Sequence, residues 1–154
     1  MKKLKFSKNN EFDYDGLYSF LEKIKNDFPI PLTEKQDLGL FLNKIRDYGN
    51  VFCAYDNSEV VGAIFFYANN FDDSIAFLTL LGVIDKYRKQ GVATKLLFKM
   101  FDYCAKLNFD KIQLYTHQTN NEAIKFYTKH GFYKIPCDRI GDLKMECLLN
   151  EVRK

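Results

Sequence analysis

Arg88, Gly91 and Ala93 form the pattern Arg-x-x-Gly-x-Ala between two different kinds of segment. The apolar run from 76 to 84 before it is typical of a strand, and the residues after Gly91 have helical spacing. The first N–H groups of a helix lack partners within it, and small residues let an anion approach them closely. The pattern therefore predicts a phosphate site, although a plain turn with solvated basic residues would look similar. It is neither the dinucleotide fingerprint nor a P-loop, because the glycine spacing differs.

A second segment, from Asn120 to Phe132, is typical of a short helix with an Asn cap and a glycine stop. Asn120, Ala123 and Tyr127 are followed by Gly131 and Phe132 in the order Asn-x-x-Ala-x-x-x-Tyr-x-x-x-Gly-Phe. Tyr127 falls four residues after Ala123, on one helix face, so core packing alone could account for a tyrosine here.

Together the two segments resemble the motifs of the GCN5-related N-acetyltransferase (GNAT) family. The family's first motif is a strand ending in Leu-x-Val, followed by Arg/Gln-x-x-Gly-x-Gly/Ala; the chain has Leu81-Gly82-Val83 and then Arg88-x-x-Gly91-x-Ala93. The second motif is the one that begins at Asn120. The resemblance implies a single domain over residues 1–154. Its expected fold is of the α/β (α+β) class, a mixed and mostly antiparallel central sheet with helices on both faces and two central strands that splay apart.

The resemblance also implies an activity, the transfer of an acetyl group from acetyl-CoA to a primary amine. Since no cysteine occupies a place that suggests an acetyl-enzyme, we expect direct attack in a ternary complex without a metal. The sequence leaves the acceptor open between a small amine, an amino sugar and a protein amine. The alternative is a non-catalytic acyl-CoA-binding module.

The resemblance assigns cofactor contacts to two stretches and one cap. The amides from Lys89 to Thr94, with the Thr94 hydroxyl, are candidates for the pyrophosphate, and the backbone of 81–83 for the pantetheine amides and the oxyanion. The expected cofactor residues are Leu81, Gly82, Val83, Arg88, Lys89, Gln90, Gly91, Val92, Ala93, Thr94 and Asn120.

Tyr127 is the expected catalytic residue. In the family, the tyrosine at this motif position donates a proton to the leaving thiolate, and a phenol is chemically suited to that role. The general base is less clear, because many relatives carry a glutamate where this chain has Thr79. A water chain or an acceptor amine that is already neutral could replace it.

Other side chains are weaker candidates for moving the amine proton. Asp72, Asp73 and Glu34 are carboxylates, but the two aspartates lie in a turn pattern that favours a solvated loop. His117 follows a strand and could relay a proton, although a surface histidine is the simpler interpretation. His130 precedes a helix-stopping glycine and is better suited to complement the helix C-terminus.

Composition sets the remaining expectations. The chain has 154 residues, 47% of them hydrophobic, and a net charge of +3 with acidic and basic residues interleaved. We therefore expect one cytoplasmic domain without a nucleic-acid or membrane partner, because the start lacks a secretory pattern and no apolar run approaches bilayer length. A homodimer stays open. The four cysteines, Cys53, Cys104, Cys137 and Cys147, lack metal-ligand spacing and are expected to be reduced, three of them buried.

The elements follow from periodicity and turn residues. Strands are expected at 3–7, 51–55, 60–67, 75–84, 111–116, 132–135 and 143–149, and helices at 13–27, 33–49, 91–107 and 120–130. Thr33 to Gln36 matches a capping box for the second helix.

Overall fold

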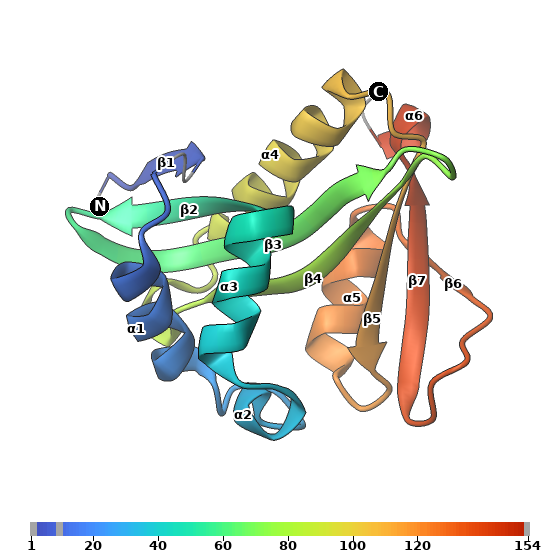
Figure 1. Cartoon of the computed structure of the whole chain (residues 1–154). Coiled ribbons are helices and arrows are strands. Elements are labelled where there is room, and N and C mark those ends of the chain that lie inside the picture. Colours follow the sequence, from blue (N-terminus) through green and yellow to red (C-terminus); the bar gives the residue numbers. More distant parts are fainter. Residues whose placement is uncertain (1–2, 9–10, 153–154) are drawn as a thin grey trace.

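The computed structural model describes residues 3–8 and 11–152. In that part of the chain a seven-stranded sheet has the order β1-β2-β3-β4-β5-β7-β6, in which only β4 and β5 pair in parallel (Figure 1). The expected mixed, mostly antiparallel sheet is therefore confirmed. Its strands are β1 (Lys5–Lys8), β2 (Asn50–Asp56), β3 (Glu59–Asn70), β4 (Ile75–Val83), β5 (Lys111–His117), β6 (Tyr133–Ile135) and β7 (Asp142–Leu148).

Helices lie on both faces of this sheet, also as expected (Figure 1). They are α1 (Tyr14–Ile24), α2 (Leu32–Lys35), α3 (Leu38–Tyr48), α4 (Val92–Lys106), α5 (Asn121–Lys129) and α6 (Leu149–Val152), with one turn of 3₁₀-helix, η1 (Asp85–Tyr87), before α4. Not one of these helices has the length and apolar character needed to cross a bilayer.

The second helix begins later than the sequence predicts. Asp37 caps α3, and its carboxylate accepts a hydrogen bond from the Leu40 N–H at 2.9 Å. Thr33 instead lies inside the separate turn α2, and Gln36 is extended, with φ −165°. The capping box at Thr33 is therefore wrong: the aspartate provides a better-placed side-chain acceptor, and the extended residue interrupts the helix.

A bulge changes the direction of β4. Phe65 of β3 pairs with Leu80, but the next residue, Phe66, pairs with Leu78, so Thr79 has no partner on β3. An extra residue of this kind shifts the alternation of side chains and increases the local twist. Leu78 accordingly packs in the core beneath α4, whereas Leu80 packs in the core beneath α1 and α3.

The two parallel strands separate immediately beyond this point. Their pairing runs from Ile75 with Lys111 to Leu78 with Leu114 and stops there, although β4 continues to Val83 and β5 to His117. The splay that the resemblance implies is confirmed. It opens a wedge between the C-terminal ends of the two central strands.

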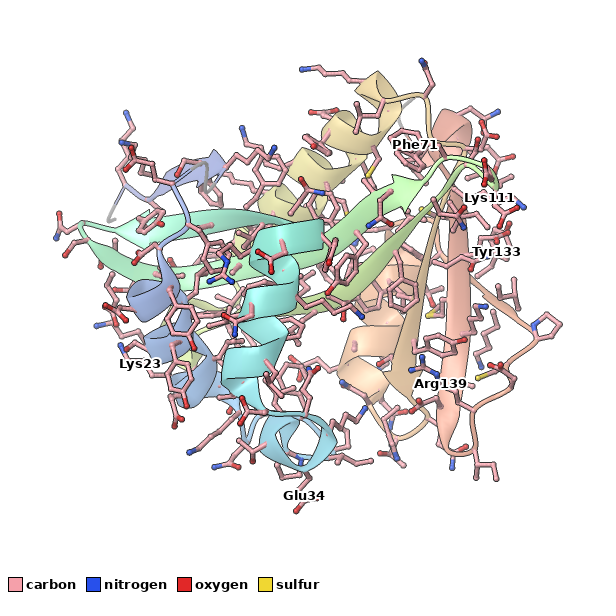
Figure 2. All side chains as sticks on the ribbon, viewed as in Figure 1. Lys23, Glu34, Phe71, Lys111, Tyr133 and Arg139 are labelled. Atoms are coloured by element: carbon pink, nitrogen blue, oxygen red, sulfur yellow. The ribbon has the colours of Figure 1, made fainter. Side chains whose placement is uncertain are left out.

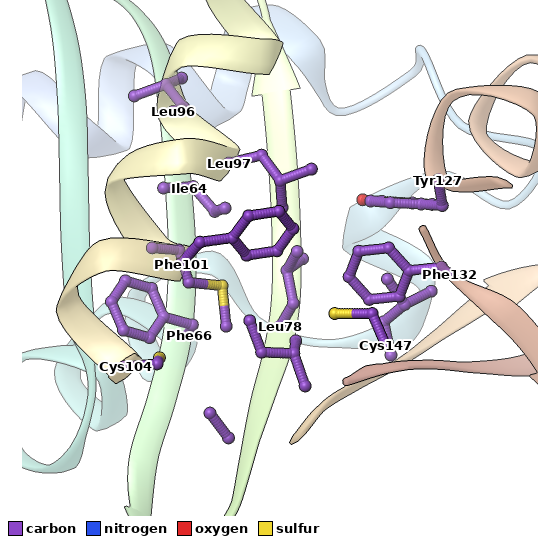
Figure 3. Packing of buried hydrophobic residues seen from close by; sticks show 14 of the residues in the cluster. Ile64, Phe66, Leu78, Leu96, Leu97, Phe101, Cys104, Tyr127, Phe132 and Cys147 are labelled. Atoms are coloured by element: carbon purple, nitrogen blue, oxygen red, sulfur yellow. The ribbon is translucent and has the colours of Figure 1, made fainter. Parts of the chain in front are cut away.

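The larger core spans the sheet on the side of α4 and α5. Figure 3 shows Leu97 and Phe101 of α4 facing Leu78 of β4, with Phe132 and Cys147 across the wedge. The smaller core lies between α1, α3 and the strands β2 to β4, and it takes no residue from β5, β6 or β7. One face of the C-terminal half of the sheet is thus left without a helix layer (Figure 1).

All four cysteines are free, and Cys53, Cys104 and Cys147 are buried, so the expectation of reduced, buried thiols is confirmed. Burial raises the pKa of both Cys104 and Cys147 to about 12. These thiols therefore stay protonated near neutral pH and behave as small apolar side chains.

Candidate active site

A cleft of about 330 Å³ opens at the wedge between β4 and α5. It is walled by the end of β4, the loop before α4, the first turn of α4, the start of α5 and the end of α1. Eleven of the twelve residues predicted from the sequence line it: Leu81, Gly82, Val83, Arg88, Lys89, Gly91, Val92, Ala93, Thr94, Asn120 and Tyr127. Gln90 does not; its side-chain amide donates to the Lys86 carbonyl at 3.3 Å.

The loop before α4 presents its backbone to the cleft. Lys89 and Gly91 both have left-handed backbone conformations, with φ of 61° and 79°. Alternating conformations of this kind form a concave set of N–H groups suited to an anion. The first bond of the helix runs from the Lys95 N–H to the Gly91 carbonyl at 3.0 Å, so the amides of the first helical turn have no carbonyl partner within the helix.

Gly91 leaves room for a ligand at this point. A Cβ built on it would meet no atom within 4 Å, so the glycine is not required by the packing of the protein itself. The positive φ at this position favours glycine over other residues. The open space beside Gly91 is available to a phosphate.

Arg88 is anchored to the protein rather than free in the cleft. Its guanidinium contacts the Asp27 carboxylate at 2.6 Å and the Asp85 carboxylate at 3.3 Å, and its Nε donates to the Val83 carbonyl at 3.0 Å. These contacts hold the loop against the end of β4 and of α1. Because two carboxylates compensate its charge, the arginine adds less positive potential than its formal charge suggests, and its contact with a cofactor stays a prediction.

The sequence did not single out two residues that shape this loop. Tyr87 is buried beneath it, and its hydroxyl donates to the Asp56 carboxylate of β2. Asp27, just after α1, lines the cleft and receives Arg88. An aromatic residue in a charged turn was the available signal for Tyr87, whereas nothing in the sequence connected positions 27 and 88.

The end of β4 offers its backbone to the wedge. One edge of Leu81, Gly82 and Val83 pairs with β3, and their other edge has no strand partner, because pairing with β5 stops at Leu78. Gly82 is also constrained from the face of the sheet. A Cβ there would lie 2.5 Å from Cδ1 of Ile24, so α1 packs directly on the glycine backbone.

Tyr127 faces the cleft from α5 with only 7% of its surface exposed. Its ring packs against Phe126 and Phe132, at centroid distances of 5.4 and 5.3 Å, and Figure 3 shows its hydroxyl pointing across the wedge. The hydroxyl has no hydrogen-bond partner in the described residues, yet no fully buried side-chain polar atom there lacks one, so this oxygen keeps access to the cleft. Burial raises the pKa of Tyr127 well above its usual value of about 10, which keeps the phenol protonated and able to donate.

Two polar side chains link α5 to its surroundings. Asn120 caps the helix, with its side-chain oxygen accepting from the Ala123 N–H at 3.2 Å, as predicted. His130 lies at the other end, and its Nδ1 is 2.8 Å from the Phe126 carbonyl, which confirms that it complements the helix C-terminus. Its Nε2 lies 3.3 Å from the hydroxyl of Thr94 on α4.

The other candidates for proton transfer do not line the cleft. Asp72 and Asp73 lie exposed in the turn at the start of β4. Six residues of strand separate that start from Leu81, roughly 20 Å. Glu34 is exposed on α2, and Nδ1 of His117 accepts from the Thr119 N–H at 3.2 Å. In the part of the chain that is described, no group of three His, Cys, Asp or Glu side chains could hold a metal.

Sequence comparison identifies the family of this chain. The model of the Acetyltransferase (GNAT) family matches residues 17–132. The chain is 36% identical over 108 residues to the protein named Probable N-acetyltransferase san of Drosophila melanogaster, covering 68% of this chain and 56% of that protein. It is 31% identical over 108 residues to N-alpha-acetyltransferase 50 of Danio rerio, covering 68% and 61%. The chain thus spans about three fifths of the length of these relatives.

Structural comparison agrees on the fold. The PaiA N-acetyltransferase of Thermoplasma acidophilum, in complex with coenzyme A, superposes with a TM-score of 0.78 at 18% identity, over 95% of this chain and 99% of that one. The ribosomal-protein-S18-alanine N-acetyltransferase of Escherichia coli gives 0.77 at 18% identity, over 96% and 94%. The matched range includes the loop before α4, the end of β4 and Tyr127, and the chain belongs to the GNAT family of acetyltransferases.

Proposed function

We propose that this protein transfers the acetyl group of acetyl-CoA to the α-amino group of a peptide or protein. Membership of the family and the coenzyme A complex of a structural neighbour support the cofactor. The relatives named as N-alpha-acetyltransferases, from Danio rerio, Schizosaccharomyces pombe and Xenopus tropicalis, support the acceptor. Four cysteines without a disulfide support a reducing compartment such as the cytoplasm.

Thr79 occupies the position where many relatives carry a glutamate, and this is the observation that favours an α-amine. An α-amino group has a pKa near 8, so roughly a tenth of it is neutral at pH 7. A lysine side chain has a pKa near 10.4, and only roughly one molecule in two thousand is neutral there. A site without a strong base on β4 can therefore use the first amine far more readily than the second.

The cofactor-binding residues act mainly through their backbone. In this mechanism the amides of 89–94 hold the pyrophosphate, and the unpaired edge of Leu81 to Val83 holds the pantetheine arm in the wedge. An N–H on that edge would stabilise the oxyanion on the acetyl carbonyl.

The acetyl transfer proceeds by direct attack, without a covalent enzyme intermediate. The amine nitrogen attacks the carbonyl carbon, the carbon–sulfur bond breaks, and the nitrogen loses a proton to water. Tyr127 donates its proton to the departing thiolate and regains one from solvent afterwards. Its raised pKa keeps the hydroxyl protonated, so that a proton is present when the thiolate leaves, and excludes Tyr127 as the base at neutral pH.

Release of free thiol from acetyl-CoA tests the acceptor class. Two peptides of the same sequence would be compared, one with a free α-amine and a blocked lysine, and the other with the reverse. We expect turnover with the first and little with the second at pH 7. Equal rates would contradict the α-amine assignment, and binding of acetyl-CoA without turnover on any amine would favour the non-catalytic module.

Replacing Tyr127 with phenylalanine tests the proton donor. The change deletes one oxygen and keeps the ring between Phe126 and Phe132. We expect turnover to fall by roughly tenfold to ten-thousandfold, with the melting temperature and the affinity for acetyl-CoA nearly unchanged. Full activity in the variant would leave Tyr127 as a packing residue only.

A further inference from the structure

His130 is held in one tautomer by the helix that carries Tyr127. Its Nδ1 lies 2.8 Å from the Phe126 carbonyl, and a carbonyl can only accept, so this nitrogen carries a hydrogen. The ring is fixed between Phe126 and Phe98, at centroid distances of 4.6 and 5.8 Å. In a neutral imidazole, Nε2 is therefore an acceptor.

This tautomer determines which way the Thr94 hydroxyl points. Nε2 of a neutral His130 can only accept the Thr94 proton across the 3.3 Å contact. The hydroxyl then directs its lone pairs, and not its hydrogen, toward the cleft that Thr94 lines. A phosphate oxygen at that position would meet lone pairs and be repelled.

Protonation of the imidazole reverses this arrangement. With hydrogens on both nitrogens, His130 keeps its bond to Phe126 and also donates from Nε2 to the Thr94 oxygen. The Thr94 hydrogen is then free to donate to a phosphate. The added positive charge strengthens the same interaction, since charge-assisted hydrogen bonds are the stronger kind.

The two helices that carry Thr94 and Tyr127 place charged side chains of both signs around His130. On α4 and α5 the cations are Lys95, Lys99, Lys106, Lys125 and Lys129, and the carboxylates are Asp102 and Glu122, of which Glu122 lines the cleft. Lys95 lies over the ring of Phe6, and among the described residues His130 takes part in no salt bridge. A pyrophosphate beside Thr94 would offset these positive charges.

We propose that His130 is a positioning residue for the cofactor: when the pyrophosphate binds, His130 takes up a proton and turns the Thr94 hydroxyl into a phosphate donor. This inference rests on the proposed placement of the pyrophosphate at the start of α4. Since the bound form holds the proton more tightly than the free form, affinity should rise as the pH falls and be lost as the pH rises.

Calorimetric titration with dephospho-CoA is the test. This probe keeps the pyrophosphate but lacks the 3′-phosphate, whose own ionisation near neutral pH would obscure the signal. Titrations at pH 7 in buffers of different ionisation enthalpy give the number of protons taken up. We expect the wild-type protein to take up a fraction of one proton and its affinity to rise between pH 8 and pH 6, by at most about tenfold per pH unit.

Three variants separate the proposal from a purely structural role. His130→Phe keeps the ring packing and removes both hydrogen bonds, whereas His130→Gln places a neutral N–H near the former Nε2. Both should abolish the proton uptake, and the glutamine variant should keep more of the affinity. In a Thr94→Val background, His130→Phe should cost no further affinity, whereas alone it should cost roughly tenfold.

Pantetheine, which has no phosphate, is the control ligand, and its binding should not respond to any of these changes. Unchanged proton uptake in both His130 variants would overturn the inference. Failure of the wild-type protein to bind dephospho-CoA at all would instead refute the proposed placement of the cofactor.

Discussion

The two sides of the β4–β5 wedge are built in different ways. On the cleft side the ligand-facing surface consists largely of backbone and small or apolar residues, such as Gly82, Gly91 and Ala93. On the opposite face, β5 and β7 have no helix layer, and the residues that alternate with the buried ones are mostly polar, with Leu148 as an apolar exception: Lys111, Gln113, Tyr115, Lys144 and Glu146. Figure 2 labels Lys111 of β5, Tyr133 of β6 and Arg139 of the loop between β6 and β7 in this C-terminal part of the molecule. We call the face of β5 and β7 that carries these polar residues the open face.

This difference between the two surfaces indicates which of them can vary in ligand specificity. A surface made of backbone amides fits one kind of ligand, an anion or an amide, whichever side chains lie nearby. A surface made of side chains on strands can change its chemistry one residue at a time without altering the fold. We therefore expect the cofactor on the cleft side and the acceptor-specific contacts on the open face.

The largest expected difference is in thiol reactivity, between a cysteine buried in the core and one near the surface. Cys147 of β7 points into the core, whereas Cys137 lies partly exposed in the loop from β6 to β7. A thiol with a pKa of about 12 has roughly a thousandfold less thiolate than an ordinary one. At pH 8 a thiol reagent should modify Cys137 alone, as mass spectrometry of the native protein would show. Rapid labelling of Cys147 would mean that β7 does not pack as described.

Gly91→Asp tests the backbone-built side. A carboxylate beside the helix start would repel phosphate, and the affinity for coenzyme A should fall by tenfold or more, about 1.4 kcal/mol. Gly141→Asp is the matched control, because Gly141 also has a positive φ, 85°, but lies before β7 and outside the cleft. Calorimetry should find weak binding only in the Gly91 variant; equal losses in both would point to backbone strain instead.

Tyr115→Ala tests the side-chain-built side. The ring lies one residue beyond the last β4–β5 pair, 5.7 Å from Phe77, with the Arg139 guanidinium 3.6 Å above it. We expect the Michaelis constant for the acceptor peptide to rise roughly threefold to tenfold, about 1 kcal/mol, with coenzyme A affinity unchanged. Tyr133→Ala, on the same half of the sheet but on β6, should leave both constants alone. A change in coenzyme A affinity would remove the distinction between the two sides.

Glu146→Gln should have the smallest effect. Burial works to raise the pKa of this carboxyl, but hydrogen bonds from Gln113 and Tyr133 and the charges of Lys111 and Lys144 outweigh it and hold the pKa below its usual value. The carboxylate thus stabilises the fold above pH 5, and this contribution is lost as the pH falls through its folded-state pKa. Urea unfolding should show a loss of about 1 kcal/mol at pH 7 that shrinks toward pH 3. A loss independent of pH would mean that packing, not charge, matters there.

The sequence predicted the cleft side better than the open face, for a physical reason. The residue types at Gly91, Asn120 and Tyr127 are determined by local structure: a left-handed turn, a helix cap and a helix face, respectively. Local structure of this kind produces sequence patterns with fixed spacing. The anchoring of Arg88 by Asp27 joins residues that are far apart in the chain, and no pattern reveals such a pair. The open face carries ordinary strand alternation, which shows which residues face solvent but not what they bind.

The elements were predicted well where apolar periodicity was long, as in α4, and poorly where capping chemistry competed. Thr33 and Asp37 both offered a side-chain oxygen near the start of α3, and only the three-dimensional course of the chain selected Asp37. The contact of His130 with Thr94 belongs to the same class, since it joins two helices that the sequence shows separately.

The extra residue at Thr79 makes the site sensitive to the count of residues along β4. Leu78 and Leu80 are two positions apart yet lie in different cores, because the bulge adds one residue between them. If Thr79 paired as a regular strand residue instead of forming a bulge, strict alternation would exchange the faces of everything after it. Leu81 would then turn toward α1, and Gly82, which α1 needs to be bare, would turn away. The shape of the wedge is therefore encoded by an insertion as much as by any side chain, and related chains should be aligned with a gap permitted at this one position.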